Sequence, residues 1–313
     1  MARVLFRRAP AGRRLVRGEN VRVVQQALKD RGFDPRSLDG IFGGDTQVAI
    51  GNWQRDTGAA ETGEVTFGEW EALADRPAPT LFDRALQLTA DFEQHGFGKI
   101  AGNFDDAWLT WGIIGFTLKH GELQRMLTEV QFKHPGLLQQ AFGAGAAELM
   151  EMINSGTAAQ EAFANRISIG RNRVKVEPEW AQSFETLGTF PEVQQIQLRG
   201  VDKYWKIAQR DAARFALMSE LGIALCFDIA VQNGGIDFAT EENSIRRRAE
   251  QSSITDEPAL RLLIADVVAE NSKQQYVEDV RNRKRTIATG QGVVHAASYS
   301  LEDWGLADVR VGT

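Results

Sequence analysis

Acidic side chains flank a glycine-rich loop within residues 92–123. Glu93 precedes the loop, while Asp105 and Asp106 follow it, just before an apolar block at residues 108–118. A glycosidase needs two carboxyl groups on opposite sides of a sugar bond, one kept protonated and the other ionised. The spacing fits such an enzyme. From spacing alone, the commoner explanation is a helix end and a polar turn in front of a core element.

Helical patterns lie on both sides of this loop. Leu81, Ala85, Leu88 and Phe92 share one helical face, so the spacing predicts a helix that ends at Glu93. Apolar residues also recur at helical spacing farther along the chain, in segments 123–127, 137–153, 180–187 and 191–214. These patterns predict a mainly α domain around the two carboxylates.

The loop and the apolar block resemble the active-site region of the chitosanase-like lysozymes, which comprise glycoside hydrolase family 46 and its peptidoglycan-cleaving relatives. The resemblance is carried by Asn103-Phe104-Asp105 and Thr110-Trp111-Gly112-Ile113-Ile114-Gly115-Phe116. It implies that Glu93, at the end of the first catalytic-domain helix, is the general acid. It also implies that Asp105, seven residues before Gly112, is the base that handles water, and that Thr110 helps to hold this water.

The same resemblance implies a two-lobed, lysozyme-like helical fold with Glu93 and Asp105 on opposite walls of a cleft. Expected substrate-binding residues are Asp106, Trp108, Glu122 and Asn233. One departure bears on the substrate. Chitosanases proper follow the catalytic Asp with Gly-Arg-Gly, whereas this chain has Asp106-Ala107-Trp108 there.

One charge interrupts a long apolar segment near the C-terminus. Residues 215–231 are apolar nearly all round, which indicates a buried central helix, yet they include Asp228. A buried charge needs a partner, and Arg281, Arg283 and Arg285 are the candidates. The resemblance implies an Asp–Arg network behind the catalytic site, with Asp228, Arg281 and Arg285 as its members. A purely structural salt bridge explains these residues equally well.

The N-terminal segment carries a second motif. Val21 to Leu28 and Asp39 to Gln54 resemble the signature of the three-helix peptidoglycan-binding module. The resemblance implies that glycan or stem peptide binds beside a turn formed by Asp39, Gly40, Phe42, Gly43 and Thr46. The glycines and Phe42 also have a structural explanation, because glycine permits the turn and Phe42 fills a small core.

These motifs define the expected domain layout. We expect a basic arm at residues 1–17, a peptidoglycan-binding domain at 18–75, a short linker at 76–80 and a lysozyme-like hydrolase domain at 81–313. The module is expected to act by raising the local concentration at the wall. Deleting residues 1–78 is then expected to leave the cleavage of short soluble glycans intact.

Because a wall-binding module precedes the hydrolase domain, we expect a lysozyme-type muramidase. It would cleave between N-acetylmuramic acid and N-acetylglucosamine by inverting hydrolysis. Two alternatives stay open. One is a chitosanase, in which acidic residues bind the cationic polymer. The other is a wall-binding protein whose lysozyme-like domain has lost activity.

Charge is unevenly distributed along the chain. Residues 1–17 contain six arginines and no acidic residue, whereas the whole chain has a formal net charge of −6. The arm is either a solubilising lead-in with a short edge strand at residues 3–7 or a contact for an anionic envelope polymer. The acidic body argues against nucleic acid as the main partner.

The remaining composition excludes several other classes. Cys226 is the only cysteine, and the four histidines lack metal-ligand spacing, so we expect no metal and no cofactor. No apolar run reaches about 18 residues, so no transmembrane segment is expected. The N-terminus lacks the apolar core of a signal peptide. We expect synthesis in the cytoplasm and delivery to the wall or periplasm by holin-mediated release or a secretion system.

Overall fold

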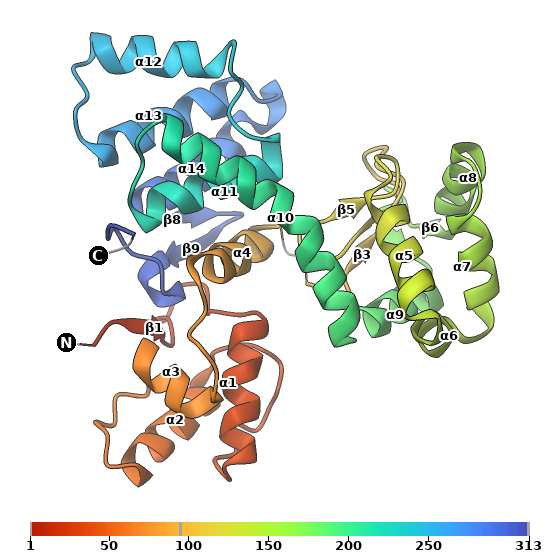
Figure 1. Ribbon diagram of the computed structural model, residues 1–313, viewed down its shortest axis with the longest axis horizontal. Coiled ribbons are helices and arrows are strands. Elements are labelled where there is room, and N and C mark those ends of the chain that lie inside the picture. The colour runs from red at the N-terminus through yellow and green to blue at the C-terminus, as the bar shows by residue number, and fades with distance from the viewer. Residues whose placement is uncertain (1, 94–95, 312–313) are drawn as a thin grey trace. The chain divides into compact units, whose positions relative to one another are not determined.

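A computed structural model describes residues 2–93 and 96–311, and the chain folds as two compact units. The split unit combines Met1–Phe92 with Tyr204–Thr313, and the inserted unit is Glu93–Lys203. Helices dominate both units, and the strands are short (Figure 1). The expected mainly α fold is confirmed.

The split unit begins with a small three-helix bundle. Its elements are β1 (Val4–Phe6), α1 (Glu19–Asp30), α2 (Gly44–Asp56), β2 (Val65–Thr66) and α3 (Phe67–Ala74). The apolar face expected at residues 21–28 is the buried face of α1. Thr66 and Glu69 exchange hydrogen bonds in a capping box that begins α3. β1 pairs antiparallel with β2, so the edge strand expected in the basic arm is present.

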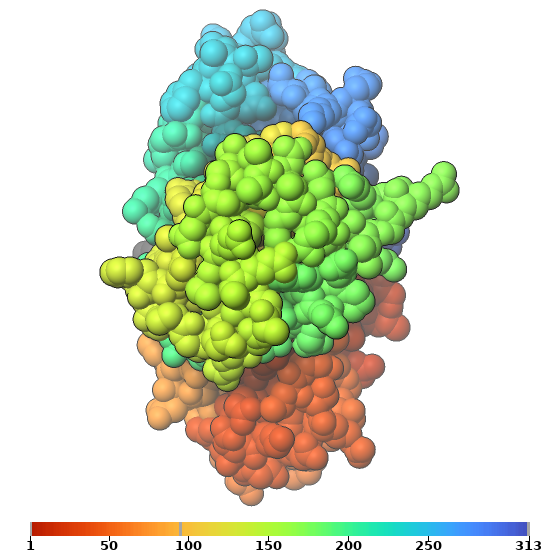
Figure 2. Space-filling model, turned by 90° about the vertical axis from the view of Figure 1, so that its right-hand side faces the viewer, coloured from red at the N-terminus to blue at the C-terminus, as the bar shows by residue number. Residues whose placement is uncertain are grey.

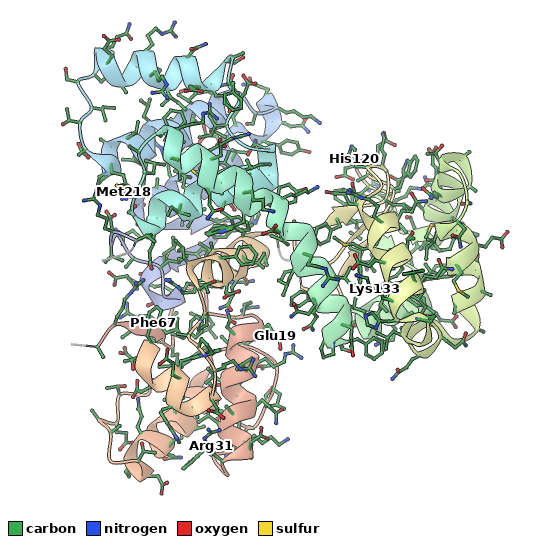
Figure 3. The ribbon with its side chains drawn as sticks, in the orientation of Figure 1. Glu19, Arg31, Phe67, His120, Lys133 and Met218 are labelled. Carbon is green, nitrogen blue, oxygen red and sulfur yellow. The ribbon has the colours of Figure 1, made fainter. Side chains whose placement is uncertain are left out.

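Ion pairs fasten the arm and the bundle to the rest of the split unit. Arg3 and Arg84 both bind the buried carboxylate of Glu220. Both guanidinium groups also lie over the ring of Phe67, at 4.9 and 5.1 Å from its centre. Phe67 is labelled in Figure 3. Burial raises the pKa of Glu220, but the hydrogen bonds and charges of Arg3 and Arg84 outweigh burial and lower it. The bundle is therefore packed against the helices that follow it.

The rest of the split unit surrounds a buried central helix. Its elements are α4 (Leu81–Phe92), α11 (Glu220–Asn233), α12 (Glu241–Gln251), α13 (Glu257–Glu270), η2 (Gln274–Tyr276), α14 (Val277–Thr289), β8 (Gln291–Val294), β9 (Ala297–Ser300) and η3 (Leu301–Trp304). α11 packs against α4, α13 and α14. It begins later than its apolar run because Ser219 caps it by accepting the N–H of Gly222. β8 and β9 form an antiparallel hairpin.

The inserted unit combines a small sheet with helices. Its elements are β3 (Ile100–Ala101), β4 (Thr110–Trp111), β5 (Phe116–Thr117), α5 (Glu122–Lys133), α6 (Pro135–Phe142), η1 (Gly143–Gly145), α7 (Ala146–Ile153), α8 (Thr157–Ile167), β6 (Ser168–Ile169), β7 (Lys175–Val176) and α9 (Pro178–Leu187). The order of the sheet is β3-β4-β5, all antiparallel. In the core, edge-to-face contacts join Phe142 to Phe184 and Phe163 to Trp180, and a tilted contact joins Phe142 to Trp180. Side chains of this unit form the continuous yellow-to-green surface in Figure 2.

The division between the two units falls within one long helix, α10 (Pro191–Arg214). None of the helices in the described ranges combines the length and apolarity that crossing a membrane requires.

Candidate active site

Glu93 lies directly after α4. The helix ends at Phe92, as the spacing predicts, and Glu93 is half-buried in the following turn. Residues 94–95 lie outside the described part of the chain. The two residues before Glu93, Asp91 and Phe92, are buried. The backbone therefore enters Glu93 from a well-packed helix end.

The two neighbouring aspartates on the far side of the loop differ in their surroundings. Asp106 is exposed, has a positive φ of 66° and forms an ion pair with Lys119. Asp105 is also exposed, and among the described residues its partner is the backbone N–H of Ala107, 3.2 Å from Oδ1. Asp105 is therefore the carboxylate that is available as a base. The substrate contact expected of Asp106 competes with its pairing to Lys119.

Asn103 braces the loop that carries Asp105. Its backbone N–H donates to Ser168 Oγ at 2.9 Å, and its side-chain amide donates to Asn165 Oδ1 at 2.8 Å. The amide oxygen accepts the N–H of Trp108 at 3.1 Å. These bonds fix the start and the end of the loop to α8 and β6. The sequence motif includes Asn103, but the motif by itself indicates no such role.

Thr110 begins β4, beside the end of this loop. Its backbone lies in register with Ala101 of β3 and Thr117 of β5. Thr110 is half-buried, whereas Leu109 and Trp111 on either side are fully buried. Side chains alternate along a strand, so Thr110 faces away from the core that holds its neighbours. Its hydroxyl has no hydrogen-bond partner among the described residues, which leaves it available to a water molecule.

Trp108 does not present the sugar-binding surface expected of it. The side chain is 7% exposed, and the residue has a positive φ of 65°. It packs into the unit and ends the loop, and contact of Trp108 with substrate stays a prediction. The exposed aromatic ring beside Asp105 belongs to Phe104, at 52%.

Two other expected substrate contacts lie elsewhere. Glu122 begins α5, and its largely covered carboxylate pairs with Lys203 at 2.6 Å. Its second oxygen accepts the N–H of Thr117 at 3.4 Å. Contact of Glu122 with substrate stays a prediction. Asn233 is exposed at the end of α11, in the split unit. Its contact with substrate stays a prediction.

A buried glutamine that sequence reasoning missed links the two sides of the loop. Gln197 on α10 donates to the carbonyl of Phe97 at 2.8 Å and accepts the N–H of Ile113 at 2.9 Å. Phe97 lies four residues after Glu93, and Ile113 lies three residues after Thr110. One amide thus ties the segment after Glu93 to the segment after Thr110. Gln197 lies far from Phe97 and Ile113 in the sequence, so no sequence pattern indicated this role.

Asp228 is fully buried on α11 and has two cationic partners on α14. Arg283 Nη2 lies 2.7 Å from Oδ1, and Lys284 Nζ lies 2.6 Å from Oδ2. Thr89 of α4 also donates to Oδ1 at 3.1 Å. Burial raises the pKa of Asp228, but the two cations outweigh burial and hold that pKa well below its usual range. The expected network is present and reaches α4.

The partners expected for Asp228 were partly wrong. Arg281 and Arg285 lie one helical turn apart on α14 and pair with Asp266 of α13. Arg283 is two residues from each, about 200° around the helix axis. That rotation turns its side chain toward α11 instead of α13.

Motif residues of the N-terminal bundle build the turn between α1 and α2. Gln25 accepts the N–H of Gly40 at 2.8 Å and donates to Asp39 Oδ1 and Thr46 Oγ1, both at 3.1 Å. Phe42 and Thr46 are buried and support the turn from inside. Ligand contact by these two stays a prediction. Asp39 is exposed and stays a candidate for ligand contact.

The two glycines of this turn have structural roles. Gly40 has a φ of +72°, and a Cβ there would lie 2.9 Å from the carbonyl oxygen of Gly18. Gly43 is the N-cap of α2, in extended conformation. The motif therefore specifies the shape of the turn, and contact of Gly40 and Gly43 with a ligand stays a prediction.

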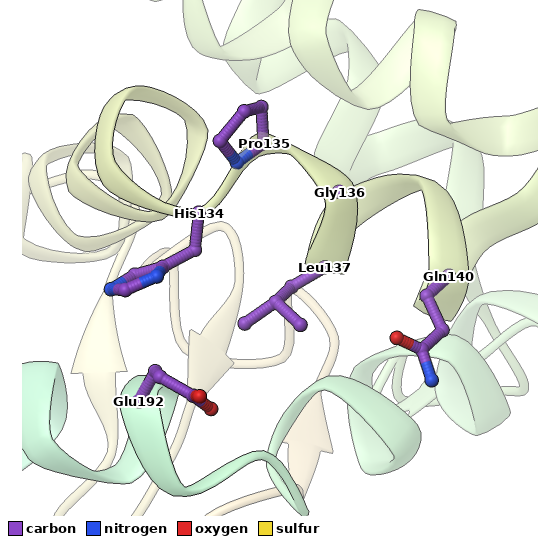
Figure 4. A pocket seen from close by; sticks show the side chains of 6 residues that line it. All are labelled: His134, Pro135, Gly136, Leu137, Gln140 and Glu192. Atoms are coloured by element: carbon purple, nitrogen blue, oxygen red, sulfur yellow. The ribbon is translucent and has the colours of Figure 1, made fainter.

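A separate shallow pocket lies on the inserted unit, lined by His134, Pro135, Gly136, Leu137, Gln140 and Glu192 (Figure 4). The candidate catalytic residues are not among its lining residues. We assign it no part in the candidate site.

Together these features describe a mainly helical protein in which a braced loop presents Asp105 and Thr110, and a packed helix ends at Glu93. Residues 17–73 match the family model of the putative peptidoglycan binding domain, which confirms the resemblance of the N-terminal segment. No curated protein matches the chain as a relative.

Solved chitosanase structures are similar to the chain. The glycoside hydrolase family 46 chitosanase of Gynuella sunshinyii in complex with chitotetraose is 16% identical, with a TM-score of 0.42, over 67% of this chain and 85% of that one. The native chitosanase of Bacillus subtilis is 18% identical, with a TM-score of 0.44, over 67% of this chain and 86% of that one. Similarity at this level assigns neither activity nor site residues.

Proposed function

We propose that the chain is a peptidoglycan hydrolase, a muramidase that cleaves the glycan strand of the bacterial cell wall. One observation carries the choice of substrate. The segment that matches the peptidoglycan-binding family is packed in the same compact unit as α4, the helix that ends at Phe92, directly before Glu93. The wall-binding segment thus belongs to the same folded unit as the helix that leads into the proposed general acid.

The proposed reaction is a single displacement. Glu93 donates its proton to the glycosidic oxygen, so that the bond to the anomeric carbon breaks and the leaving sugar departs as an alcohol. Water attacks the anomeric carbon from the opposite face, and Asp105 accepts the proton that this water loses. Thr110 orients the water through its hydroxyl. The exposure of Asp105 and the orientation of Thr110 away from the core support these roles.

Chitosanase activity is the second candidate. The loop exposes two neighbouring carboxylates, Asp105 and Asp106, and the chain has a net charge of −6. Both features suit a cationic polymer such as chitosan. The pairing of Asp106 with Lys119 weakens this attraction, and we therefore rank chitosan below peptidoglycan.

The test is a comparison of substrates with the purified full chain and its Glu93→Gln variant. Zymograms on peptidoglycan and on soluble chitosan separate the two activities, and mass spectrometry of the wall digest identifies the new reducing-end sugar. N-acetylmuramic acid at that end supports the muramidase. Clearing of chitosan alone supports the chitosanase, and no clearing of either supports a non-catalytic wall-binding protein. Action at the wall after holin release or secretion is part of the proposal.

A further inference from the structure

A buried carboxylate at the end of α4 is held by the arm that precedes the wall-binding module. Asp91, 6% exposed, accepts two bonds from the guanidinium group of Arg14, Nε to Oδ2 at 3.0 Å and Nη2 to Oδ1 at 2.9 Å. This bidentate geometry is the strongest common form of an Arg–carboxylate pair. Arg17 Nε lies 3.5 Å from Oδ1, on the same carboxylate.

The third partner of Asp91 comes from β9. The hydroxyl of Tyr299 donates to Asp91 Oδ2 at 2.6 Å. Burial raises the pKa of Tyr299, and the charge of Asp91 raises it further, so the hydroxyl keeps its proton and remains a donor. Phe92, the next residue of α4, packs edge-to-face on the ring of Tyr299, with 4.9 Å between centroids. The guanidinium group of Arg283, which also pairs with Asp228, lies over the ring of Phe92.

The backbone around Arg14 is anchored on both sides. On one side the N–H of Arg14 donates to the carbonyl of Ser298 in β9 at 2.7 Å. On the other side the carbonyl of Val16 accepts the N–H of Phe42 in the turn of the module at 2.9 Å. Arg14 therefore stands between the module and the hairpin that supplies Tyr299. The N-terminal arm is therefore hydrogen-bonded both to the β8–β9 hairpin and to the module.

We propose that Arg14 is a positioning residue for the general acid, acting through Asp91 on the last turn of α4. The inference rests on the proposed function, because it concerns the same Glu93. Glu93 follows Asp91 and Phe92 directly in the chain, so the position of its Cα depends on that turn. The arm that leads into the wall-binding module is then part of the catalytic structure.

This proposal contradicts the tether expectation drawn from the sequence. A pure tether changes binding to intact wall and leaves the hydrolysis of short soluble glycans unchanged. A positioning residue changes kcat on short glycans, because a displacement of about 1 Å in a catalytic group can cost about 100-fold in rate. Deleting residues 1–78 removes Arg14 and is expected to lower kcat on every substrate.

The experiment compares Arg14→Ala with a matched control, Arg7→Ala, in the full chain. Arg7 lies on the same arm and is exposed to the same extent as Arg14, with side chains 30% and 28% exposed. Its Nε lies 2.5 Å from the buried carboxylate of Asp303, away from the end of α4. Both variants lose one arginine–aspartate pair. Only Arg14→Ala removes a partner of Asp91, which keeps Arg17 and Tyr299.

Four quantities are measured for each variant: kcat and KM on soluble glycan fragments, retention on sacculi and melting temperature. We expect Arg14→Ala to lower kcat at least about tenfold, with KM and sacculus retention within about twofold of wild type. Arg7→Ala is expected to lower the melting temperature comparably and to keep its kcat. Arg14→Lys restores the charge without the bidentate fork, so a partial recovery of kcat is expected.

Equal kcat values for Arg14→Ala and Arg7→Ala overturn the inference while leaving the hydrolase proposal intact. A wild-type chain that cleaves no wall fragment overturns both. If Arg14→Ala does not fold, Tyr299→Phe takes its place, because it removes one bond to Asp91 and keeps the ring against Phe92. A full kcat in both folded variants, Tyr299→Phe and Arg14→Lys, overturns the inference as well.

Discussion

The side-chain oxygen of Gln197 lies over Gly112, so close that a Cβ on Gly112 would come within 2.4 Å of it. Gly112 also has a φ of +88°, in the region that side chains other than glycine rarely adopt. The same glutamine bonds to Phe97 and Ile113. Close approach of this amide to the backbone therefore depends on the absence of a side chain at Gly112.

We expect Gly112→Ala to lower the free energy of unfolding by more than about 2 kcal/mol, because the left-handed conformation costs about 1–2 kcal/mol and the collision with Gln197 adds to it. Gly170→Ala is the matched control, with a φ of +86° and nothing within 4 Å of an added Cβ. Urea unfolding followed by circular dichroism measures both. Equal losses in the two variants would show that the Gln197 contact is unimportant.

The sequence predicted elements whose apolar stripe is continuous. The end of α4 was placed within one residue because its apolar residues recur at helical spacing, although the fold buries every residue from Arg84 to Phe92. The candidate loop was found because its polar residues are close in sequence. The orientation of Trp108 was not predictable in the same way, since its positive φ turns the ring inward and no local pattern specifies that angle.

Contacts between segments that are far apart in the chain could not be predicted from the sequence alone. The need of Asp228 for a cationic partner followed from its apolar surroundings, but the choice of Arg283 depends on which face of α14 meets α11. Arg14 and Asp91 are 77 positions apart. A run of arginines without acids is usually solvated, so nothing local indicated that this one is half-buried against α4.

Asp228→Asn should be strongly destabilising at neutral pH, by about 3–5 kcal/mol, because it removes the buried carboxylate charge that Arg283 and Lys284 share. The pKa of Asp228 is lowered in the folded state. The contribution of the Asp228 carboxylate to the free energy of unfolding is therefore complete above the unfolded-state pKa of about 3.9. It is lost as the pH falls toward the folded-state pKa. The difference between wild type and variant should narrow below about pH 4.

Asp266→Asn is the control for this prediction. Asp266 also faces two arginines, Arg281 and Arg285, but its partners are more exposed. The Asp266→Asn substitution should lower the free energy of unfolding by no more than about 1 kcal/mol. Denaturant unfolding at several pH values measures both variants. Equal losses, or a difference that stays constant down to acid pH, would contradict the buried-pair account.

Phe104→Ala should raise KM on glycan substrates with little change in kcat. The ring is exposed directly before Asp105, where it can stack on the apolar face of a sugar. Loss of about 1 kcal/mol of such contact corresponds to about fivefold in KM. Phe132→Ala is the control, because Phe132 is 85% exposed on α5, outside the loop. A KM that changes equally in both variants would refute a specific role for Phe104.

Glu93→Gln should cut hydrolysis at least about 100-fold, with an unchanged melting temperature. Glutamine keeps nearly the same shape but cannot donate the proton that the leaving oxygen requires. Glu151→Gln, at an exposed position of α7, controls for the loss of one carboxylate in the inserted unit. Turbidity clearing of purified peptidoglycan measures the rate. A Glu93→Gln variant within a few-fold of wild type would remove Glu93 as the acid.

The last prediction concerns the stereochemistry of the reaction and the use of water by Asp105. The loop between Glu93 and Asp105 contains three glycines, Gly96, Gly98 and Gly102, so it can carry the chain across a substrate without bringing the two carboxyl groups together. A separation of about 6.5–9.5 Å leaves room for water and gives inversion, whereas about 5 Å allows direct attack and gives retention.

Thr110 favours water, because its side chain faces away from the core and the sheet already pairs its backbone. A hydroxyl in that position can fix the water while Asp105 accepts its proton. We expect Asp105→Asn to be nearly inactive and Thr110→Ala to be folded but slow. Thr128→Ala on α5 should keep full activity, because its hydroxyl only bonds its own helix. Proton NMR of the first product decides the mechanism: a new reducing end that appears as the β-anomer would refute single displacement by water.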